Sequence, residues 1–319
     1  MIAEDGLDVF WATGHVLPSG LGSSVATVIL VCDLVWRLYP ATMGYFNRIV
    51  HWLFAERSVR EADMIITISD STRRDLEAML GVSPKKIRVI YPAVSAPYDR
   101  LQPAAAAGYI ARKYHVSESY ICTVGTIEPR KNLATLVDTV RILRDRGALR
   151  HQFLIAGAAG WRDSKIYEKA KRLGLTDREV RFLGYVAEED LPFFYSGASL
   201  FLFPSLYEGF GLPLVEAMAC GVPIVASDTS SIPEVVQGAA ILASPDRPED
   251  FADAVTRVTT DRDLRDEMIK KGLERARCFR WDQTASQILE VLKEVSQSGH
   301  EKRPADGAFD KPTGGPAWD

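Results

Sequence analysis

The sequence predicts an α/β protein built from two Rossmann-like domains with parallel sheets. Short apolar runs rich in β-branched residues alternate with amphipathic helical stretches, and a proline-rich interruption divides the chain into two blocks. The apolar runs are continuous rather than alternating, as expected for strands that are covered on both faces. Strand–helix–strand repetition of this kind indicates parallel sheets with helices packed on them.

The upstream block contains four predicted strands, at residues 8–11, 25–31, 64–68 and 87–90. A helix is predicted after the third strand, with Ser69 or Asp70 as its N-cap. Between Tyr91 and Tyr120 three prolines and an alanine-rich stretch break the pattern. We interpret this segment as an interdomain linker that leads into a short helix.

The downstream block contains six predicted strands and is expected to form a complete doubly wound domain. The strands are placed at residues 120–124, 152–156, 180–183, 200–203, 223–226 and 239–242. Asn132 is predicted to cap the helix after the first of them, because the apolar residues from Leu133 to Leu143 have the spacing of one helical face.

Composition excludes several classes of protein. The 319 residues are 47% apolar and carry a net charge of −4, which gives no electrostatic case for binding nucleic acid. The longest apolar runs are too short to span a bilayer, and the first residues do not resemble a secretory signal. The four cysteines form no Cys-x-x-Cys pair, so we expect a reducing, cytoplasmic compartment.

The segment from Ser205 to Glu216 carries the clearest functional pattern. Gly209 and Gly211 allow the backbone to approach a ligand closely, and Pro213 suits the first turn of a helix. A glycine-flanked helix N-terminus at the carboxyl edge of a parallel sheet favours anions. Glu208 precedes this helix and Glu216 lies about one turn inside it, so the two can reach different parts of one extended ligand. The alternative is an ordinary strand–loop–helix connection with a surface glutamate.

A second pattern follows the predicted strand 120–124. The adjacent cations Arg130 and Lys131 precede a helix N-terminus, where charge and backbone amides together favour a diphosphate. A solvated pair of cations at a turn is the alternative interpretation.

The Glu-x7-Glu spacing of Glu208 and Glu216 resembles that of glycosyltransferase family 4, whose retaining enzymes have the two-domain GT-B fold. The resemblance implies that Glu208 contacts the transferred sugar and that Glu216 binds the ribose of the nucleotide. It further implies that backbone amides hold sugar hydroxyls and the distal phosphate; these belong to Gly209, Phe210, Gly211 and Leu212.

In the family, the loop after the first strand of the second domain neutralises the donor diphosphate. Here the resemblance assigns that loop to Gly125, Thr126, Arg130 and Lys131. Many members have arginine where this chain has Thr126, and our hypothesis is that Arg130 substitutes for it. Tyr185, in a segment similar to the loop that borders the nucleotide base, is either a base contact or an ordinary loop aromatic. Glu234 is either structural or lines the cleft.

The upstream block departs from the family at one position. Residues 28–36 resemble a strand that usually ends in His-Asp, and the family's histidine touches the sugar and phosphate near the acceptor. This chain has Cys32 followed by Asp33. Because a thiol is a weak donor, the usual contact is expected to be lost or replaced. His15 is interpreted as a structural loop residue.

The resemblance covers residues 8–295. Family members begin with a further strand and a glycine-rich loop, so the N-terminal domain is expected to be truncated by about 80–100 residues. We predict four parts: an incomplete acceptor-side domain with the linker (1–103), a nucleotide-sugar-binding domain (104–280), a helix that crosses back to the first domain (281–297) and a disordered tail (298–319).

The resemblance implies a retaining hexosyltransferase that uses a nucleoside diphosphate sugar as substrate, with GDP-mannose as the expected donor. The expected acceptor is a glycan or lipid-linked glycan of polysaccharide biosynthesis, and no cofactor or metal is expected. The alternatives are a non-catalytic nucleotide-sugar-binding remnant and a non-transferase GT-B enzyme such as a sugar epimerase. The expected location is the cytoplasm, at the inner face of the membrane if the aromatic segment 36–54 makes a peripheral contact; core packing explains that segment as well.

Overall fold

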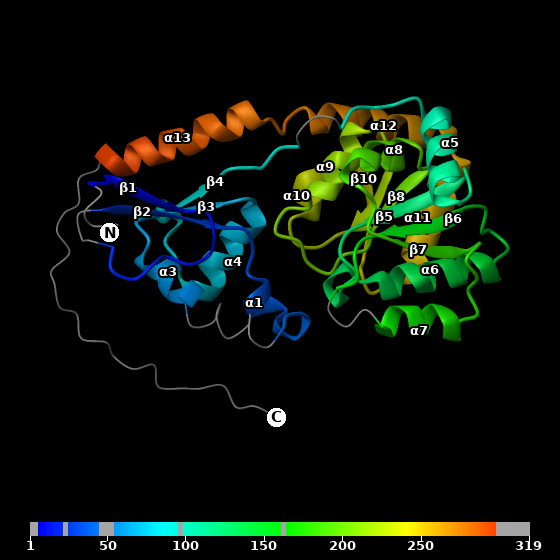
Figure 1. The fold of residues 1–319 in the computed structure, drawn as a ribbon, viewed down its shortest axis with the longest axis horizontal. Helices are drawn as coiled ribbons and strands as arrows, with labels where there is room; N and C mark the ends of the chain where they lie inside the picture. Colours follow the sequence, from blue (N-terminus) through cyan, green and yellow to red (C-terminus); the bar gives the residue numbers. More distant parts are fainter. Residues whose placement is uncertain (1–5, 22–24, 45–53, 95–97, 161–163, 298–319) are drawn as a thin grey trace.

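The protein forms two parallel sheets with helices packed on them, as shown by a computed structural model that describes residues 6–21, 25–44, 54–94, 98–160 and 164–297 (Figure 1). The first sheet has the order β1-β2-β3-β4; its strands are Val9–Ala12, Ala26–Val31, Met64–Thr67 and Ile87–Val89. The second has the order β10-β9-β8-β5-β6-β7; in that order its strands are Ala240–Ala243, Ile224–Ser227, Leu200–Phe203, Tyr120–Val124, Gln152–Ala156 and Val180–Gly184.

The α/β prediction is confirmed, and every end of these ten strands lies within one residue of the predicted position. The reason is visible in β8, whose alternate residues enter different cores. Phe201 and Phe203 belong to the core on one face of the second sheet, and Leu200 and Leu202 belong to the core on the other. A strand buried on both faces must be apolar at every position, which is the continuous pattern seen in the sequence.

Helices connect the strands and cover both faces of the second sheet. Those of the first block are α1 (Val35–Leu38), α3 (Glu56–Glu61) and α4 (Asp70–Leu80). Those that follow are α5 (Pro103–Tyr114), α6 (Leu133–Asp145), α7 (Ser164–Arg172), α8 (Leu191–Ser196), α9 (Leu212–Ala219), α10 (Ile232–Val236), α11 (Pro248–Thr260), α12 (Arg262–Ala276) and α13 (Trp281–Gln297).

The strand order of the second sheet creates a switch point between β5 and β8. From β5 the chain winds outward through β6 and β7, and it then returns to the other side of β5 through β8, β9 and β10. Loops that leave the carboxyl ends of two strands at such a point diverge and open a crevice for ligands. The two segments with functional patterns are the loops that follow these two strands, at 125–131 and 204–211.

The last helix, α13, leaves the second domain and lies along the first sheet (Figure 1). Val291 and Val295 of this helix share a buried core with Val28 and Ile66 of the sheet. The Thr284 hydroxyl also donates to the Tyr91 carbonyl at 2.7 Å. The helix thus supplies one of the two apolar layers that cover the first sheet.

Two predicted helix caps have different outcomes. The Ser69 side chain accepts from the Thr72 amide and caps α4, as predicted. Asn132 occupies the N-cap position of α6, as predicted, but its backbone is in the left-handed region with φ of 52° and its side chain makes no capping hydrogen bond. Instead, its amide donates to the carbonyls of Pro204 and Pro245, at 3.1 and 2.9 Å, and so ties the end of η5 (Pro129–Lys131) to the loop after β8.

Parts of the sequence interpretation fall outside what the structure describes. The tail 298–319 lies there, as do residues 45–53 of the aromatic segment. Across the part of the chain that is described, no helix is both long and apolar enough to cross a membrane. The predicted domain boundaries stay predictions.

Candidate active site

The candidate site is centred on Glu208, which lies between two cations at the switch point of the second sheet. Its carboxylate oxygens lie 2.9 Å from Nη1 of Arg130 and 2.6 Å from Nζ of Lys131. A backbone hydrogen bond from the Leu206 amide to the Arg130 carbonyl, 2.9 Å long, joins the two loops directly. The structure therefore brings together three of the residues singled out in the sequence. In the chain, Glu208 is 78 positions from Arg130 and 77 positions from Lys131.

This cluster is largely buried, and its opposite charges stabilise one another. The side chains of Glu208, Lys131 and Arg130 are 8%, 13% and 17% exposed. Burial alone would raise the pKa of Glu208, but Lys131 and Arg130 hold it below its ordinary value. Glu128 also pairs with Arg130, at 2.5 Å. Two carboxylates therefore pair directly with the two cations.

Close backbone packing positions the Lys131 side chain. A Cβ atom at Gly125, where φ is 147°, would lie 3.2 Å from Cε of Lys131. A Cβ atom at Gly157 would lie 1.9 Å from the Gly125 carbonyl oxygen, so both positions require glycine. Thr126 follows in the same loop. The role of Gly157 was not anticipated from the sequence; its position directly after a predicted strand was the available signal.

Two serines after β9 fix the backbone around Glu208. The Glu208 amide donates to Oγ of Ser230 at 2.9 Å. The Ser231 hydroxyl lies 2.9 Å from the carbonyls of both Glu208 and Phe210. Ser230 adopts a left-handed backbone conformation with φ of 53°. The sequence does not reveal the role of either serine, because only the fold brings this turn against the loop after β8.

The glycine segment leads into α9 as the sequence predicts. Gly211, with φ of 99°, occupies the N-cap position of the helix, and Pro213 lies in its first turn. The Phe210 side chain is only 3% exposed and packs against Tyr91 and Phe279, so a ligand can meet its backbone but not its ring. Leu212 is 41% exposed at the first position of the helix.

Glu216, on the same helix, has a separate set of partners. Its carboxylate accepts from the Tyr195 hydroxyl at 2.7 Å. Burial raises the pKa of Glu216, and hydrogen bonds from Tyr195 and Tyr98 partly oppose that shift. The side chain is therefore held by hydroxyl donors of the protein itself. Tyr185, 74% exposed, follows Gly184 at the end of β7.

On the upstream side, Cys32 directly follows β2 and lies against the loop after β8. Its carbonyl accepts from the Thr72 hydroxyl at 3.1 Å and would lie 2.2 Å from a Cβ atom at Gly209. Its amide donates to Nε2 of His15 at 3.1 Å, so this histidine supports the strand end. Burial and the neighbouring Asp33 raise the pKa of the Cys32 thiol, which keeps it protonated near neutral pH. The Asp33 carboxylate itself accepts from the Val35 amide at 3.0 Å.

Glu234 connects the two domains. Its carboxylate oxygens accept from the backbone amides of Asp70 and Ser71, at 2.6 and 3.0 Å, at the start of α4. A negative charge at this position also interacts favourably with the helix dipole. Glu234 therefore has a structural role across the interdomain boundary.

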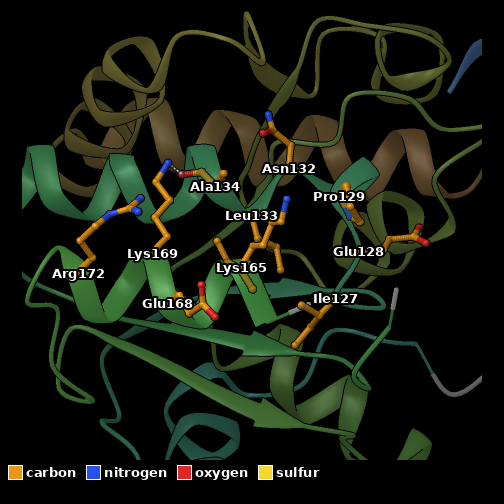
Figure 2. A pocket seen from close by; sticks show the side chains of 11 residues that line it. Ile127, Glu128, Pro129, Asn132, Leu133, Ala134, Lys165, Glu168, Lys169 and Arg172 are labelled. Atoms are coloured by element: carbon orange, nitrogen blue, oxygen red, sulfur yellow. Dashed lines mark hydrogen bonds between the residues drawn. The ribbon is translucent and has the colours of Figure 1, made fainter. Parts of the chain in front are cut away.

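A separate pocket of about 570 Å³ opens between the start of α6 and α7 (Figure 2). Its lining includes Glu128 and the cations Lys165, Lys169 and Arg172, whereas Glu208 and Glu216 do not line it. Lys169 is held by Asp138 of α6 at 2.5 Å. The pocket therefore borders the first loop on the side of α7 and is distinct from the Glu208 cluster. Within the described ranges, no group of three or more His, Cys, Asp or Glu side chains is arranged to hold a metal ion.

Two family models match the chain, each in a different block. The model described as "Glycosyl transferases group 1" matches residues 112–275, which include the whole Glu208 cluster and Glu216. The model described as "Glycosyltransferase Family 4" matches residues 17–96, which include Cys32 and Asp33.

Curated relatives agree with these matches. The chain is 33% identical to O-antigen chain mannosyltransferase B of Escherichia coli, over 75% of this chain and 64% of that protein. It is 32% identical to D-inositol 3-phosphate glycosyltransferase of Salinispora arenicola, over 75% of this chain and 56% of the relative. The chain thus spans less than two thirds of the length of either relative.

Solved structures share the architecture. Sucrose-phosphate synthase from Thermosynechococcus elongatus superposes with a TM-score of 0.73 at 23% identity, over 86% of this chain and 69% of that one. WaaG, a glycosyltransferase involved in lipopolysaccharide biosynthesis, gives a TM-score of 0.71 at 14% identity, over 91% and 79%. At these identities the likeness concerns the fold alone, and it confirms the predicted GT-B architecture of two Rossmann-like domains.

Proposed function

The chain belongs to the group 1 glycosyltransferases of the family 4 type, and on this premise we propose that it transfers a hexose from a nucleoside diphosphate sugar to an acceptor hydroxyl with retention of configuration. The observation that carries the proposal is the buried cluster of Glu208, Arg130 and Lys131 at the β5–β8 switch point. Such a cluster offers cations to a diphosphate and a carboxylate to the hydroxyls of the attached sugar.

The proposed roles follow from these contacts. Arg130 and Lys131 stabilise the negative charge that develops on the departing diphosphate, assisted by backbone amides at the start of α9. Glu208, fixed by both cations, orients the sugar. Glu216, on the same helix, anchors the ribose. These protein charges supply the electrostatic stabilisation in the proposed reaction, which needs no cofactor.

For the donor we propose GDP-mannose, and for the acceptor a glycan or lipid-linked glycan of polysaccharide biosynthesis. The similarity to the O-antigen chain mannosyltransferase of E. coli supports mannose as the sugar and a polysaccharide as the product. Synthesis of this kind would place the protein in the cytoplasm, at the inner face of the membrane.

One observation favours a second candidate, a nucleotide-sugar-binding protein without turnover. Cys32 directly follows β2 and lies against the Gly209 backbone, and the raised pKa of its thiol leaves a neutral group there. A thiol is a poor substitute for a hydrogen-bonding imidazole at an acceptor site.

A thermal-shift panel with GDP, UDP, ADP, dTDP and their common sugars tests the proposal and separates these candidates, provided that donor hydrolysis is followed in the same samples. A ligand at 100 times its Kd should add about 2.7 kcal/mol to the free energy of unfolding. A selective shift with hydrolysis supports the transferase, and a shift without hydrolysis supports the binding protein. If no nucleotide shifted the transition, the assigned donor site would be wrong.

Replacing Glu216 with glutamine should remove the preference for a nucleotide that carries ribose hydroxyls. Hydrogen bonds to a charged group contribute about 1.5–3 kcal/mol, so we expect GDP affinity to fall by roughly 10- to 100-fold. Affinity for 2′,3′-dideoxy-GDP should hardly change. Calorimetric titration of both nucleotides measures the difference.

The matched control for this experiment is Glu188→Gln, which alters a nearby carboxylate whose charge acts on Glu216. It should leave the discrimination between the two nucleotides intact. Equal losses of affinity for both nucleotides in the Glu216 variant would argue against a ribose contact.

A further inference from the structure

Successive residues of the loop after β8 face different domains. The Glu208 side chain points toward Arg130 and Lys131 of its own domain. The residues on either side of it face the first domain: Tyr207 reaches α4, and the Gly209 backbone lies against Cys32. One short loop therefore contributes both to the charge cluster and to the contact between domains.

Tyr207 connects the charge cluster to the contact between the domains. Its side chain is buried, and its hydroxyl donates to the Asp75 carboxylate of α4 at 2.8 Å. The same hydroxyl oxygen lies 3.4 Å from the donating amide of Leu34. At the other end of the residue, the Tyr207 carbonyl accepts from Nη1 of Arg130 at 2.8 Å. That nitrogen is also the one that pairs with Glu208.

A second contact docks the same helix. Glu234 holds the amides of Asp70 and Ser71, so the second domain contacts α4 at its first turn and again at Asp75. Neither contact belongs to the charge cluster, but Tyr207 lies next to Glu208 in the chain. The docking of α4 can therefore act on the Tyr207 backbone, whose carbonyl is one of the groups that hold Arg130.

We propose that Tyr207 is a positioning residue that couples the docking of α4 to the placement of Arg130 in the donor site. The claim that Tyr207 docks α4 rests on geometry alone. The claim that this docking affects Arg130 in the donor site rests on the proposed function. When the domains are docked, the Tyr207 carbonyl keeps the Arg130 guanidinium fixed beside Glu208. When they separate, the loop after β8 loses its anchor on Asp75, and Arg130 loses a fixed acceptor.

A double-mutant cycle on nucleotide affinity tests the coupling. Tyr207→Phe keeps the ring and removes the hydroxyl. It should weaken binding of the panel's preferred nucleoside diphosphate by roughly three- to tenfold, because only part of the free energy of the lost hydrogen bond to Asp75 reaches the donor site through Arg130. In an Arg130→Ala background the same change should have almost no effect, because the residue through which it acts is gone. Additive effects in the cycle would overturn the coupling, and so would an unchanged affinity in Tyr207→Phe combined with a lower melting temperature.

Small-angle X-ray scattering of the unliganded protein tests the docking. The double variant Tyr207→Phe, Glu234→Gln should have a larger radius of gyration than the wild type. Glu77→Gln is the matched control, because that α4 carboxylate pairs with Arg73 inside the first domain. An unchanged radius in the double variant would overturn the docking role. If no nucleotide of the panel bound the wild type, the proposed function and the coupling would both fail, and scattering would still decide the docking.

Discussion

Substituting Glu208 with glutamine is expected to reduce donor turnover by about a hundredfold or more and to lower the free energy of unfolding by about 3 kcal/mol. Glutamine preserves the shape of the side chain but removes the charge that separates Arg130 from Lys131. Two largely buried cations would then share a single direct carboxylate partner, Glu128, with Asp33 acting on Arg130 from further away. Removing one member of a buried ion pair is costly because the remaining charge stays uncompensated.

The change in melting temperature on nucleotide binding distinguishes this explanation from a general loss of stability in Glu208→Gln. Because a bound diphosphate supplies negative charge beside the two cations, it should raise the melting temperature of Glu208→Gln by more than it raises that of the wild type. Asp138→Asn is a suitable control, since that carboxylate pairs with Lys169 outside the cluster. A smaller shift in the Glu208 variant than in the wild type would contradict placement of the diphosphate beside these cations.

Acid provides an independent check on the same residue. The pKa of Glu208 in the folded protein lies below its ordinary value of 4.5, so its stabilising contribution is fully present above that value. The contribution is lost as the pH falls through the folded-state pKa. The difference in unfolding free energy between the wild type and Glu208→Gln should therefore narrow below about pH 4.5, as measured by urea unfolding at several pH values.

Lys131→Ala is expected to lower donor turnover by about 100- to 1000-fold, the range found when a single group that stabilises transition-state charge is removed. Affinity for a nucleoside diphosphate should fall, while affinity for the corresponding nucleoside should change little, because the lost cation acts on phosphate. Steady-state hydrolysis of the donor and calorimetric titration measure the two effects.

Lys169→Ala is the matched control for that change. Lys169 is also a paired cation on a helix, but it lines the pocket between α6 and α7 (Figure 2). Its replacement should alter turnover by no more than about twofold, as for most surface ion pairs. If Lys169→Ala lowered donor turnover as much as Lys131→Ala does, the donor site would be better assigned to that pocket.

The fold was largely predictable because its signal is local. A strand such as β8, buried on both faces, is apolar at every position, and this can be recognised without knowing its neighbours. The loops that carry Arg130, Lys131 and Glu208 were recognisable for a related reason, since each motif lies directly after such a strand. Their mutual contact is what the structure adds.

The unpredicted features depend on segments that meet only in three dimensions. Gly157 is required because its backbone touches Gly125, and Ser231 is needed because its turn packs against the loop after β8. Asn132 lies at the N-cap position that the sequence predicts, but its side-chain amide donates to Pro204 and Pro245, which are distant in the sequence, instead of capping the helix. Propensity describes the residue's own neighbours, and in these cases distant neighbours determine the conformation.

The position of α13 on the first sheet has a consequence for how the chain is made. Val291 and Val295 cover Val28 and Ile66, but Val291 is synthesised about 225 residues after Ile66, roughly 11–45 s later at ordinary elongation rates. During that interval the nascent sheet carries an uncovered apolar face. Until α13 is made, the exposed apolar face of this sheet is therefore a site where a chaperone can bind. Expression of residues 1–280, which lack α13, should give aggregated protein.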